Sequence, residues 1–250
     1  MLKGVFLDLS GVLYEGPEPL PGAVEAVSRL QASGLVLRFV TNTSRRGRRQ
    51  LLADFDSMGF AIEPSQLVTA PSVTADWLRS RQRRPYLLVH PGIRHEFADL
   101  PQDRPDTVVI GDAEDALDYN NLNHAFRLLL DGAELVATGD NRYFKASGQY
   151  WLDAGPFVRA LEYAAGVQAR VMGKPSTDFY AQVLVDAGLQ AAEVVMLGDD
   201  IHGDIEGALS AGLQACLVQS GKYRPGDETK IVGSFSSTPS LQDWVTQLGL

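Results

Sequence analysis

Eight polar side chains in this sequence follow short apolar runs, at four widely separated places. They are Asp8 and Ser10 after "GVFL", Thr41 and Asn42 after "LRFV", Lys174 after "RVMG", and Asp199, Asp200 and Asp204 after "VVMLG". Apolar runs of this length, bounded by glycine or turn residues, predict buried strands. Ligands bind beyond the carboxyl ends of the strands of a parallel sheet, so we expect these side chains to converge on one pocket.

The expected pocket has the composition of a phosphoryl-transfer site. Clustered carboxylates repel one another unless a cation joins them, and oxygen ligands with vacant positions suit Mg²⁺, which also binds phosphate. Lys174 supplies a point charge for a phosphoryl oxygen, while Thr41 and Asn42 could bind the remaining oxygens. Asp8 is then the candidate nucleophile, because carboxylates can form aspartyl-phosphate intermediates. Phosphoryl transfer mostly needs positioning and charge neutralisation, and this set provides both.

Each motif also has a purely structural explanation. A single aspartate at the end of a strand commonly caps a turn, "TNTS" is typical of a helix N-cap, and "GKP" is an ordinary turn with a solvated lysine. The acidic run "GDDIHGD" is harder to explain in this way, because it places three carboxylates within six residues after an apolar strand. The four motifs together therefore favour a functional site.

The elements that must position these residues alternate between strands and helices. Apolar patterns predict strands at 4–9 and 35–42, and helices at 23–34 and 45–60. Alternation of this kind predicts a doubly wound parallel sheet, that is, a Rossmann-like α/β fold. The tail "VGSFSSTPS" is expected to form a loop before a last helix around Trp244.

The middle of the chain reads as a second α/β unit. "YLLVHPG" and "DTVVIGDA" predict strands, and "YNNLNHAFRLLLDG" and "PFVRALEYAAG" predict helices. The C-terminal part, from "VVMLGDD" to "QACLV", again predicts a strand, a turn, a helix and a strand, as in the N-terminal part. We therefore expect a discontinuous core domain of residues 1–83 and 169–250, with a second domain inserted at 84–168.

Composition narrows the partners and the compartment. The 250 residues are 45% hydrophobic and 21% charged, which is typical of a globular protein, and the net charge is −9. A charge of this sign disfavours nucleic acid and anionic membranes as partners. The one cysteine, Cys216, excludes an intrachain disulfide, and no apolar run is long enough to span a membrane. The N-terminus does not resemble a signal peptide, so we expect a cytoplasmic location.

On these motifs the chain resembles the haloacid dehalogenase (HAD) superfamily of aspartate-nucleophile phosphatases. That family has a DxDG motif after the first strand, followed in order by a Thr/Ser, a Lys and an acidic GDD or GDx4D motif. Asp8, Thr41, Lys174 and Asp199 match these positions. The insert between the second and third motifs resembles the C2-type cap of subclass IIA, and the likeness covers nearly the whole chain, including "RPYLLVH" and "YNNLNHAF".

The resemblance implies a Mg²⁺ site and an assembly. Asp8 would be both nucleophile and metal ligand, and Asp199 would be the second carboxylate ligand. Ser10 would contribute its backbone carbonyl to the metal. Asp200 and Asp204 would hold metal-bound waters or orient the lysine. The family also implies a homodimer formed through the cap.

The resemblance further implies that Ser10, Thr41, Asn42 and Lys174 bind the phosphoryl group of a small phosphorylated substrate. Ser10 departs from the family pattern, which has there an aspartate that protonates the leaving group and later activates water. Three explanations stay open. The first is that the leaving group needs no acid, as with the P–N bonds of phospholysine and phosphohistidine or with pyrophosphate. The second is a slow phosphatase, or a transferase with a longer-lived aspartyl phosphate. The third is a protein that has lost activity and only binds phosphate. Hydrolysis of sugar or nucleotide phosphate esters and a role as phospho-acceptor are the alternative functions.

Overall fold

The computed structural model describes residues 1–146 and 148–250, and the side chains of residues 145 and 146 also lie outside the description. The chain forms two compact units. The core unit comprises Met1–Thr41, Arg48–Val68 and Lys174–Leu250, and the inserted unit comprises Asn42–Gly47 and Thr69–Gly173. These bounds differ from the expected ones chiefly in residues 69–83, which count with the inserted unit. Helix α3 (Ala70–Ser80) packs there on η2 (Pro91–Phe97), and Arg79 donates to the carbonyl of Glu96 at 2.7 Å.

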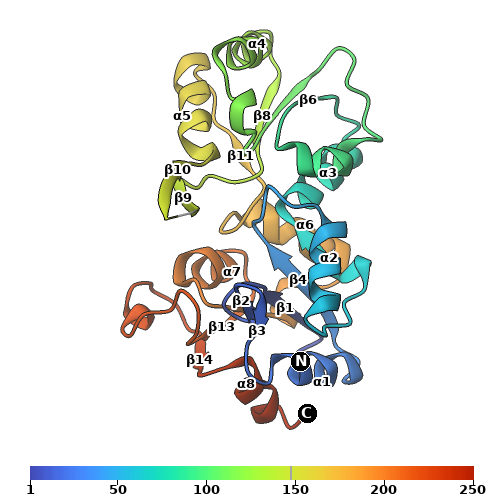
Figure 1. The fold of residues 1–250 in the computed structure, drawn as a ribbon, viewed down its shortest axis with the longest axis vertical. Helices are drawn as coiled ribbons and strands as arrows, with labels where there is room; N and C mark the ends of the chain where they lie inside the picture. Colours follow the sequence, from blue (N-terminus) through green and yellow to red (C-terminus); the bar gives the residue numbers. More distant parts are fainter. Residues whose placement is uncertain (147) are drawn as a thin grey trace. The chain divides into compact units, whose positions relative to one another are not determined.

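The core unit is built on a six-stranded sheet with the order β14-β13-β12-β1-β4-β5 (Figure 1). The strands are β1 (Gly4–Asp8), β4 (Val36–Thr41), β5 (Leu67–Thr69), β12 (Val194–Gly198), β13 (Gln214–Val218) and β14 (Ser236–Thr238). Strand β1 pairs in parallel with β4 and β12, and β12, β13 and β14 continue the parallel ladder. Strands β1 and β12 are buried along their whole length, as expected for central strands covered on both faces. The predicted doubly wound parallel sheet is confirmed.

The order of the strands places a topological switch point beside β1. From β1 the chain proceeds outward through β4 and β5 on one side, and through β12, β13 and β14 on the other. Leu7 pairs with Leu197 across this point. Ligands of doubly wound sheets bind where the strand order reverses, outside the carboxyl ends of the strands. Asp8 ends β1 and Asp199 directly follows β12, so both residues lie at this position.

Helices cover both faces of the core sheet. On one face, α1 (Ala23–Ala32), α2 (Arg48–Ser57) and α8 (Leu241–Gln247) contribute to a buried cluster with Val5 and Leu7 of β1. The other face is covered by α6 (Thr177–Ala187) and α7 (Gly207–Ser210), which pack on β4 and β13. Because side chains alternate along a strand, Phe6 points to this second face.

The C-terminal tail differs in part from its prediction. Helix α8 contains Trp244 and confirms the expected last helix. The segment expected to be a loop contains the strand β14, because Ser236–Thr238 pair in parallel with Cys216–Val218. A strand of three residues, exposed at Ser236 and Ser237, has no apolar run by which the sequence could reveal it.

The inserted unit has its own parallel sheet, in the order β11-β8-β7-β6. Its elements are β6 (Pro85–Leu88), β7 (Thr107–Ile110), α4 (Tyr119–Leu130), β8 (Glu134–Ala137), β9 (Tyr143–Ala146), β10 (Gln149–Leu152), α5 (Ala154–Ala165) and β11 (Arg170–Val171). Side chains of α4 and α5 form a buried cluster with those of β7 and β8. The strands and helices expected in this stretch are therefore present, and the β9–β10 hairpin is an addition.

One predicted core strand belongs to the other unit. We expected "VMGKPS" to end a core strand, but β11 pairs with β8 in the sheet of the inserted unit, so that expectation is wrong. Strand β11 consists of two residues, Arg170 and Val171, which pair with Val136 and Ala137 of β8. So short a strand carries no sequence pattern that shows which sheet it joins. Lys174, three residues later, counts with the core unit.

Short elements complete the chain. They are β2 (Tyr14–Glu15), β3 (Glu18–Pro19), the 3₁₀ helices η1 (Pro64–Gln66), η3 (Glu114–Ala116), η4 (Ala191–Glu193) and η6 (Asp227–Thr229), and the π-helix η5 (Ile201–Glu206). Among the residues that the structure describes, no helix has the length and apolar character needed to cross a membrane.

Candidate active site

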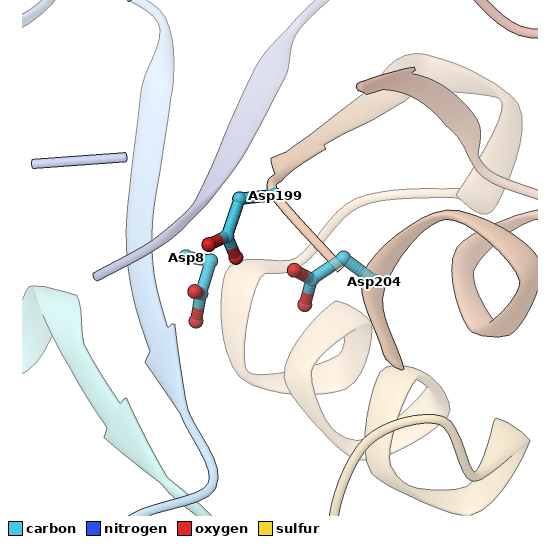
Figure 2. A group of neighbouring side chains, drawn as sticks. All are labelled: Asp8, Asp199 and Asp204. Atoms are coloured by element: carbon cyan, nitrogen blue, oxygen red, sulfur yellow. The ribbon is translucent and has the colours of Figure 1, made fainter. Parts of the chain in front are cut away.

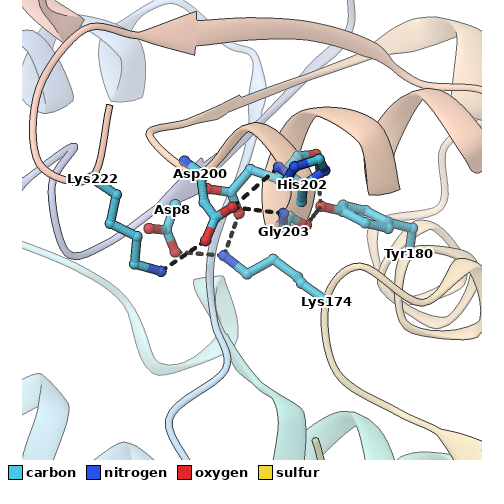
Figure 3. Close-up of polar contacts among 8 residues, drawn as sticks. Asp8, Lys174, Tyr180, Asp200, His202, Gly203 and Lys222 are labelled. Atoms are coloured by element: carbon cyan, nitrogen blue, oxygen red, sulfur yellow. Dashed lines mark hydrogen bonds and ion pairs between the residues drawn. The ribbon is translucent and has the colours of Figure 1, made fainter. Parts of the chain in front are cut away.

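A buried lysine joins two buried carboxylates at the end of β1. The Lys174 Nζ donates to Asp8 Oδ1 and to Asp204 Oδ1, each at 2.6 Å (Figure 3). All three residues are buried: Asp8 and Lys174 are 8% exposed, and Asp204 is 1% exposed. Buried charges are stable only when they are paired, so each member of this triad depends on the others.

Asp199 lies beside this triad in a space that only glycines leave open. Its Oδ2 accepts a hydrogen bond from the backbone N–H of Lys222 at 2.7 Å. A Cβ atom built on Gly11 would lie 2.0 Å from the same oxygen, and one built on Gly221 would lie 2.1 Å from it. Gly11 and Gly221 also have positive φ angles of 88° and 54°, which favour glycine. The position of Asp199 therefore requires the absence of side chains at both places.

The π-helix η5 carries the rest of the acidic motif. Asp200 caps it, because Asp200 Oδ1 accepts from the backbone N–H groups of His202 and Gly203 at 3.1 and 2.9 Å. The hydroxyl of Tyr180 donates to the carbonyls of Gly203 and Asp204 at 3.2 and 3.0 Å. A π-turn leaves backbone groups without ordinary helical partners and is frequent at functional sites. Tyr180 satisfies two of these carbonyls and so fixes the position of Asp204.

Burial sets the direction of the pKa shifts at the site. Desolvation raises the pKa of Asp199 and of Asp204 to about 6 each, with Lys174 opposing the shift of Asp204. Desolvation also raises the pKa of Asp8, again against the attraction of Lys174. For Lys174, burial acts to lower the pKa, but Asp204 and Asp8 outweigh it and the net shift is upward. The lysine is therefore a permanent cation within a set of carboxylates that lack sufficient positive charge.

Asp200 differs from its neighbours because its hydrogen bonds outweigh its burial. Desolvation acts to raise its pKa, but the N–H group of Gly203 and the ammonium of Lys222 lower it. Asp200 therefore stays ionised over the whole pH range in which Asp199 and Asp204 titrate.

The structure brings five of the eight predicted residues together in the core unit. These are Asp8, Lys174, Asp199, Asp200 and Asp204, which are linked directly or through Lys222. Thr41 is the half-buried last residue of β4, the neighbour of β1. Asn42 is half-buried and counts with the inserted unit, and Ser10 is exposed two residues after Asp8.

Sequence reasoning missed four residues that shape the site: Tyr180, Gly11, Gly221 and Lys222. One signal was available for the last two. Strand β13 ends at Val218 on the same edge of the sheet as β1, and the polar run "SGK" follows it. Polar residues after any strand of the sheet lie at the ligand-binding edge. The role of Gly11 depends on a close approach to a residue far along the sequence, and no local pattern indicates it.

The donor set fits a divalent cation. Ligand oxygens of Asp8, Asp199 and Asp204 all lie within 4.8 Å of one another (Figure 2). Asp199 Oδ1 is buried and has no hydrogen-bond partner, although buried carboxylate oxygens are normally paired. A cation would supply that missing partner.

In metal-free protein, Asp199→Asn is expected to stabilise the core unit at pH 7.5 and to change little at pH 4. The folded-state pKa of Asp199, about 6, exceeds its ordinary value of 3.8. Between these values the folded protein holds a proton that the unfolded chain has released, so stability falls as the pH rises through this window. Removing the charge should recover up to about 3 kcal/mol at pH 7.5.

Urea denaturation in a chelator at both pH values measures this difference. Asp56→Asn, at an exposed position of α2, is the matched control and should leave the free energy of unfolding unchanged at both pH values. If Asp199→Asn changed the free energy of unfolding equally at both pH values, the assignment of an unpaired buried charge to Asp199 would be contradicted.

Comparisons with known proteins agree with this geometry. The family model for haloacid dehalogenase-like hydrolases matches residues 5–101, and a second HAD-hydrolase-like model matches residues 171–244. The phospholysine phosphohistidine inorganic pyrophosphate phosphatase of Homo sapiens is 44% identical over 234 residues, which cover 91% of this chain and 86% of that protein. The haloacid dehalogenase-like hydrolase domain-containing protein 2 of Bos taurus is 42% identical over 230 residues, covering 92% of this chain and 89% of that protein.

Solved structures show the same fold. The p-nitrophenyl phosphatase from Archaeoglobus fulgidus superposes with a TM-score of 0.89 at 26% identity, covering 98% of this chain and 99% of its own. NagD from E. coli K-12 superposes with a TM-score of 0.87 at 25% identity, covering 97% of this chain and 98% of its own. Relatedness at this level, over most of the chain, shows that the protein belongs to the haloacid dehalogenase-like hydrolases, as one of their phosphatases.

Proposed function

We propose that the protein is a Mg²⁺-dependent phosphatase that acts through an aspartyl-phosphate on Asp8. The observation that carries the proposal is the Asp8–Lys174–Asp204 triad beside the unpartnered oxygen of Asp199. A carboxylate that is buried at a strand end and held by an ammonium is a positioned nucleophile. Its neighbours supply the charge neutralisation that phosphoryl transfer needs.

The residues that would hold Mg²⁺ are Asp8, Asp199 and the backbone carbonyl of Ser10. When bound, the cation neutralises the carboxylates and the phosphoryl oxygens. Asp204 supports the set from the side of Lys174, and Asp200 fixes the turn that carries Asp204, since its N–H donates to Asp204 Oδ2 at 3.2 Å. These two aspartates would act on the metal through water or through the lysine.

The chain's own residues account for the two chemical steps. The Asp8 carboxylate attacks phosphorus, and the electron pair of the broken bond departs with the leaving group. Lys174 favours the ionised form of Asp8 against the effect of burial and supplies positive charge to the phosphoryl oxygens, which Thr41 also binds. Water then attacks phosphorus, the bond between phosphorus and the Asp8 oxygen breaks with its electron pair on Asp8, and the proton of the water passes to the released phosphate or to solvent.

We propose P–N bonds, as in phospholysine and phosphohistidine, or pyrophosphate as the bonds that are cleaved. Two observations support this choice. The relative from Homo sapiens carries these substrates in its name. Ser10 also stands where an acid would protonate a poor leaving group, and an amine or imidazole can depart with its own proton. Small phosphate esters are the second candidate, because the Archaeoglobus fulgidus neighbour is a p-nitrophenyl phosphatase.

Phosphate release in Mg²⁺ tests the proposed function. The substrates are phospholysine, phosphohistidine, pyrophosphate and a set of sugar and nucleotide esters. Asp8→Asn should lower kcat by about a thousandfold or more, because it removes the nucleophile. Asp56→Asn, the exposed control in α2, should behave as the wild type. No Mg²⁺-dependent release from any substrate, or full activity of Asp8→Asn, would indicate a protein that only binds or accepts phosphate.

Ser10→Asp tests the leaving-group explanation. Restoring a carboxyl group two residues after the nucleophile should raise kcat on alkyl phosphate esters by about a hundredfold, the usual size of general-acid assistance. P–N substrates should gain little, since their leaving groups need no external acid. Ser10→Asn is the control of similar size without an acid and should give no gain. Equal gains on both substrate classes would refute this explanation of Ser10.

We also propose that the protein forms a homodimer through the inserted unit. The β9–β10 hairpin exposes four large side chains, Tyr143, Tyr150, Trp151 and Leu152, between 53% and 72% exposed. Clustered exposed apolar side chains of this kind are typical of interfaces. Light scattering should give twice the chain mass of 27.1 kDa. Trp151→Lys should shift the protein toward monomer, whereas Tyr163→Lys on α5 should not; a wild-type monomer at all concentrations would contradict the proposal.

A further inference from the structure

Lys222 is attached to the acidic cluster of the core unit at both of its ends. Its backbone N–H donates to Asp199 Oδ2 at 2.7 Å. Its Nζ donates to Asp200 Oδ2 at 3.0 Å, as Figure 3 shows. The contact between Gly221 and Asp199 fixes the backbone just before it. The ammonium of Lys222 is therefore positioned next to the proposed catalytic carboxylates by two independent contacts.

The partner of this ammonium is itself rigid. Asp200 Oδ1 is occupied by the N–H groups of His202 and Gly203, and its own N–H donates to Asp204. Only Oδ2 of Asp200 is turned toward Lys222. The carboxylate thus holds the ammonium in place without being drawn away from the helix that it caps.

Lys174 and Lys222 differ in what they leave available for a ligand. The Lys174 side chain is 6% exposed and lies between two carboxylates. The Lys222 side chain is 69% exposed, and the side chain of Asp200, with which it forms an ion pair, is 32% exposed. An ion pair as exposed as this contributes little to stability, so folding does not explain it. An exposed ammonium held at the edge of an anion-binding site can still donate to a bound anion.

We propose that Lys222 binds a second phosphoryl group, the one that leaves when pyrophosphate or another phosphoanhydride is cleaved. The inference rests on the proposed function of the same site. When Asp8 attacks the first phosphorus, the bond from that phosphorus to the bridging oxygen breaks, and the electron pair stays on the oxygen of the departing phosphate. Lys222 compensates this negative charge electrostatically and donates no proton. An ammonium in this role replaces the acid that Ser10 does not provide.

The charge of the substrate makes Lys222 selective. A phosphoanhydride carries a second phosphoryl group, whose oxygens are anionic before and after cleavage, whereas a simple phosphate ester or a P–N substrate has no anionic group at that position before cleavage. A lysine acts as a point charge and is suited to a phosphate oxygen. Lys222 should therefore favour phosphoanhydrides and contribute little to substrates with a single phosphoryl group.

Binding of two phosphonates tests the proposal without turnover. Methylenediphosphonate has two phosphoryl groups and a bridge that cannot be hydrolysed; methylphosphonate has one. Calorimetry at a fixed free Mg²⁺ concentration should show that Lys222→Met weakens methylenediphosphonate binding about tenfold more than methylphosphonate binding, as expected for one charge-assisted hydrogen bond. Lys222→Arg keeps the positive charge and should retain most of the wild-type difference in affinity between the two phosphonates. Lys230→Met removes a comparable exposed lysine, paired with Asp227, and should match the wild type.

The proposal would be overturned if Lys222→Met weakened the binding of both phosphonates equally, or if it left the difference in affinity between them unchanged. Kinetics give a second measure: Lys222→Met should lower the ratio of kcat/KM for pyrophosphate to that for phosphohistidine, whose imidazole departs without a negative charge, by about tenfold, as expected for the same charge-assisted contact. An unchanged ratio would also overturn it. If the wild type releases no phosphate from any substrate, the proposed function fails, and the phosphonate comparison still decides the role of Lys222.

Discussion

The ion-paired triad of Lys174 with Asp8 and Asp204 is the constraint on which the rest of the site depends. Taking a carboxylate out of water costs several kcal/mol, and here three carboxylates, including Asp199, are almost fully buried around one ammonium. The ammonium balances one of these charges, and a divalent cation would balance the other two. The site thus has a deficit of positive charge that favours a divalent cation. Burial, together with the repulsion between the carboxylates, raises the pKa values of Asp199 and Asp204.

Topology explains how residues so far apart in the sequence form this triad. Strands β1 and β12 are neighbours at the switch point, so Asp8, which ends β1, lies beside Asp199 and the acidic turn that carries Asp204, although these residues come from opposite ends of the chain. The sheet is rigid and buried on both faces, which gives the carboxylates fixed origins. The acidic turn after β12 then only has to place Asp204 against Lys174, and the hydroxyl of Tyr180 and the N–H of Asp200 hold it there.

The strand-end pattern was sufficient to predict the parallel sheet and the convergence of Asp8, Asp199 and Asp204, because these depend on buried apolar runs and on the direction of the strands. The same pattern failed for the strand before Lys174, since two paired residues cannot show which sheet they join. It also failed for β14, whose exposed serines carry no apolar signal. Gly11 was missed because its role arises from a contact between loops that are distant in the sequence, whereas the polar run after β13 did offer a signal for Lys222.

Gly11 and Gly221 approach one oxygen of Asp199 from opposite ends of the sequence. A side chain at either position would displace the same carboxylate, so substitutions in the loop after β1 and in the loop after β13 should not act independently. Once one substitution has displaced the Asp199 carboxylate, the second substitution has a smaller further effect on it. The effects of the two substitutions on the affinity for a cation would therefore be strongly non-additive. The two loops are therefore coupled in their tolerance to mutation through a single atom, although neither glycine has any chemistry of its own.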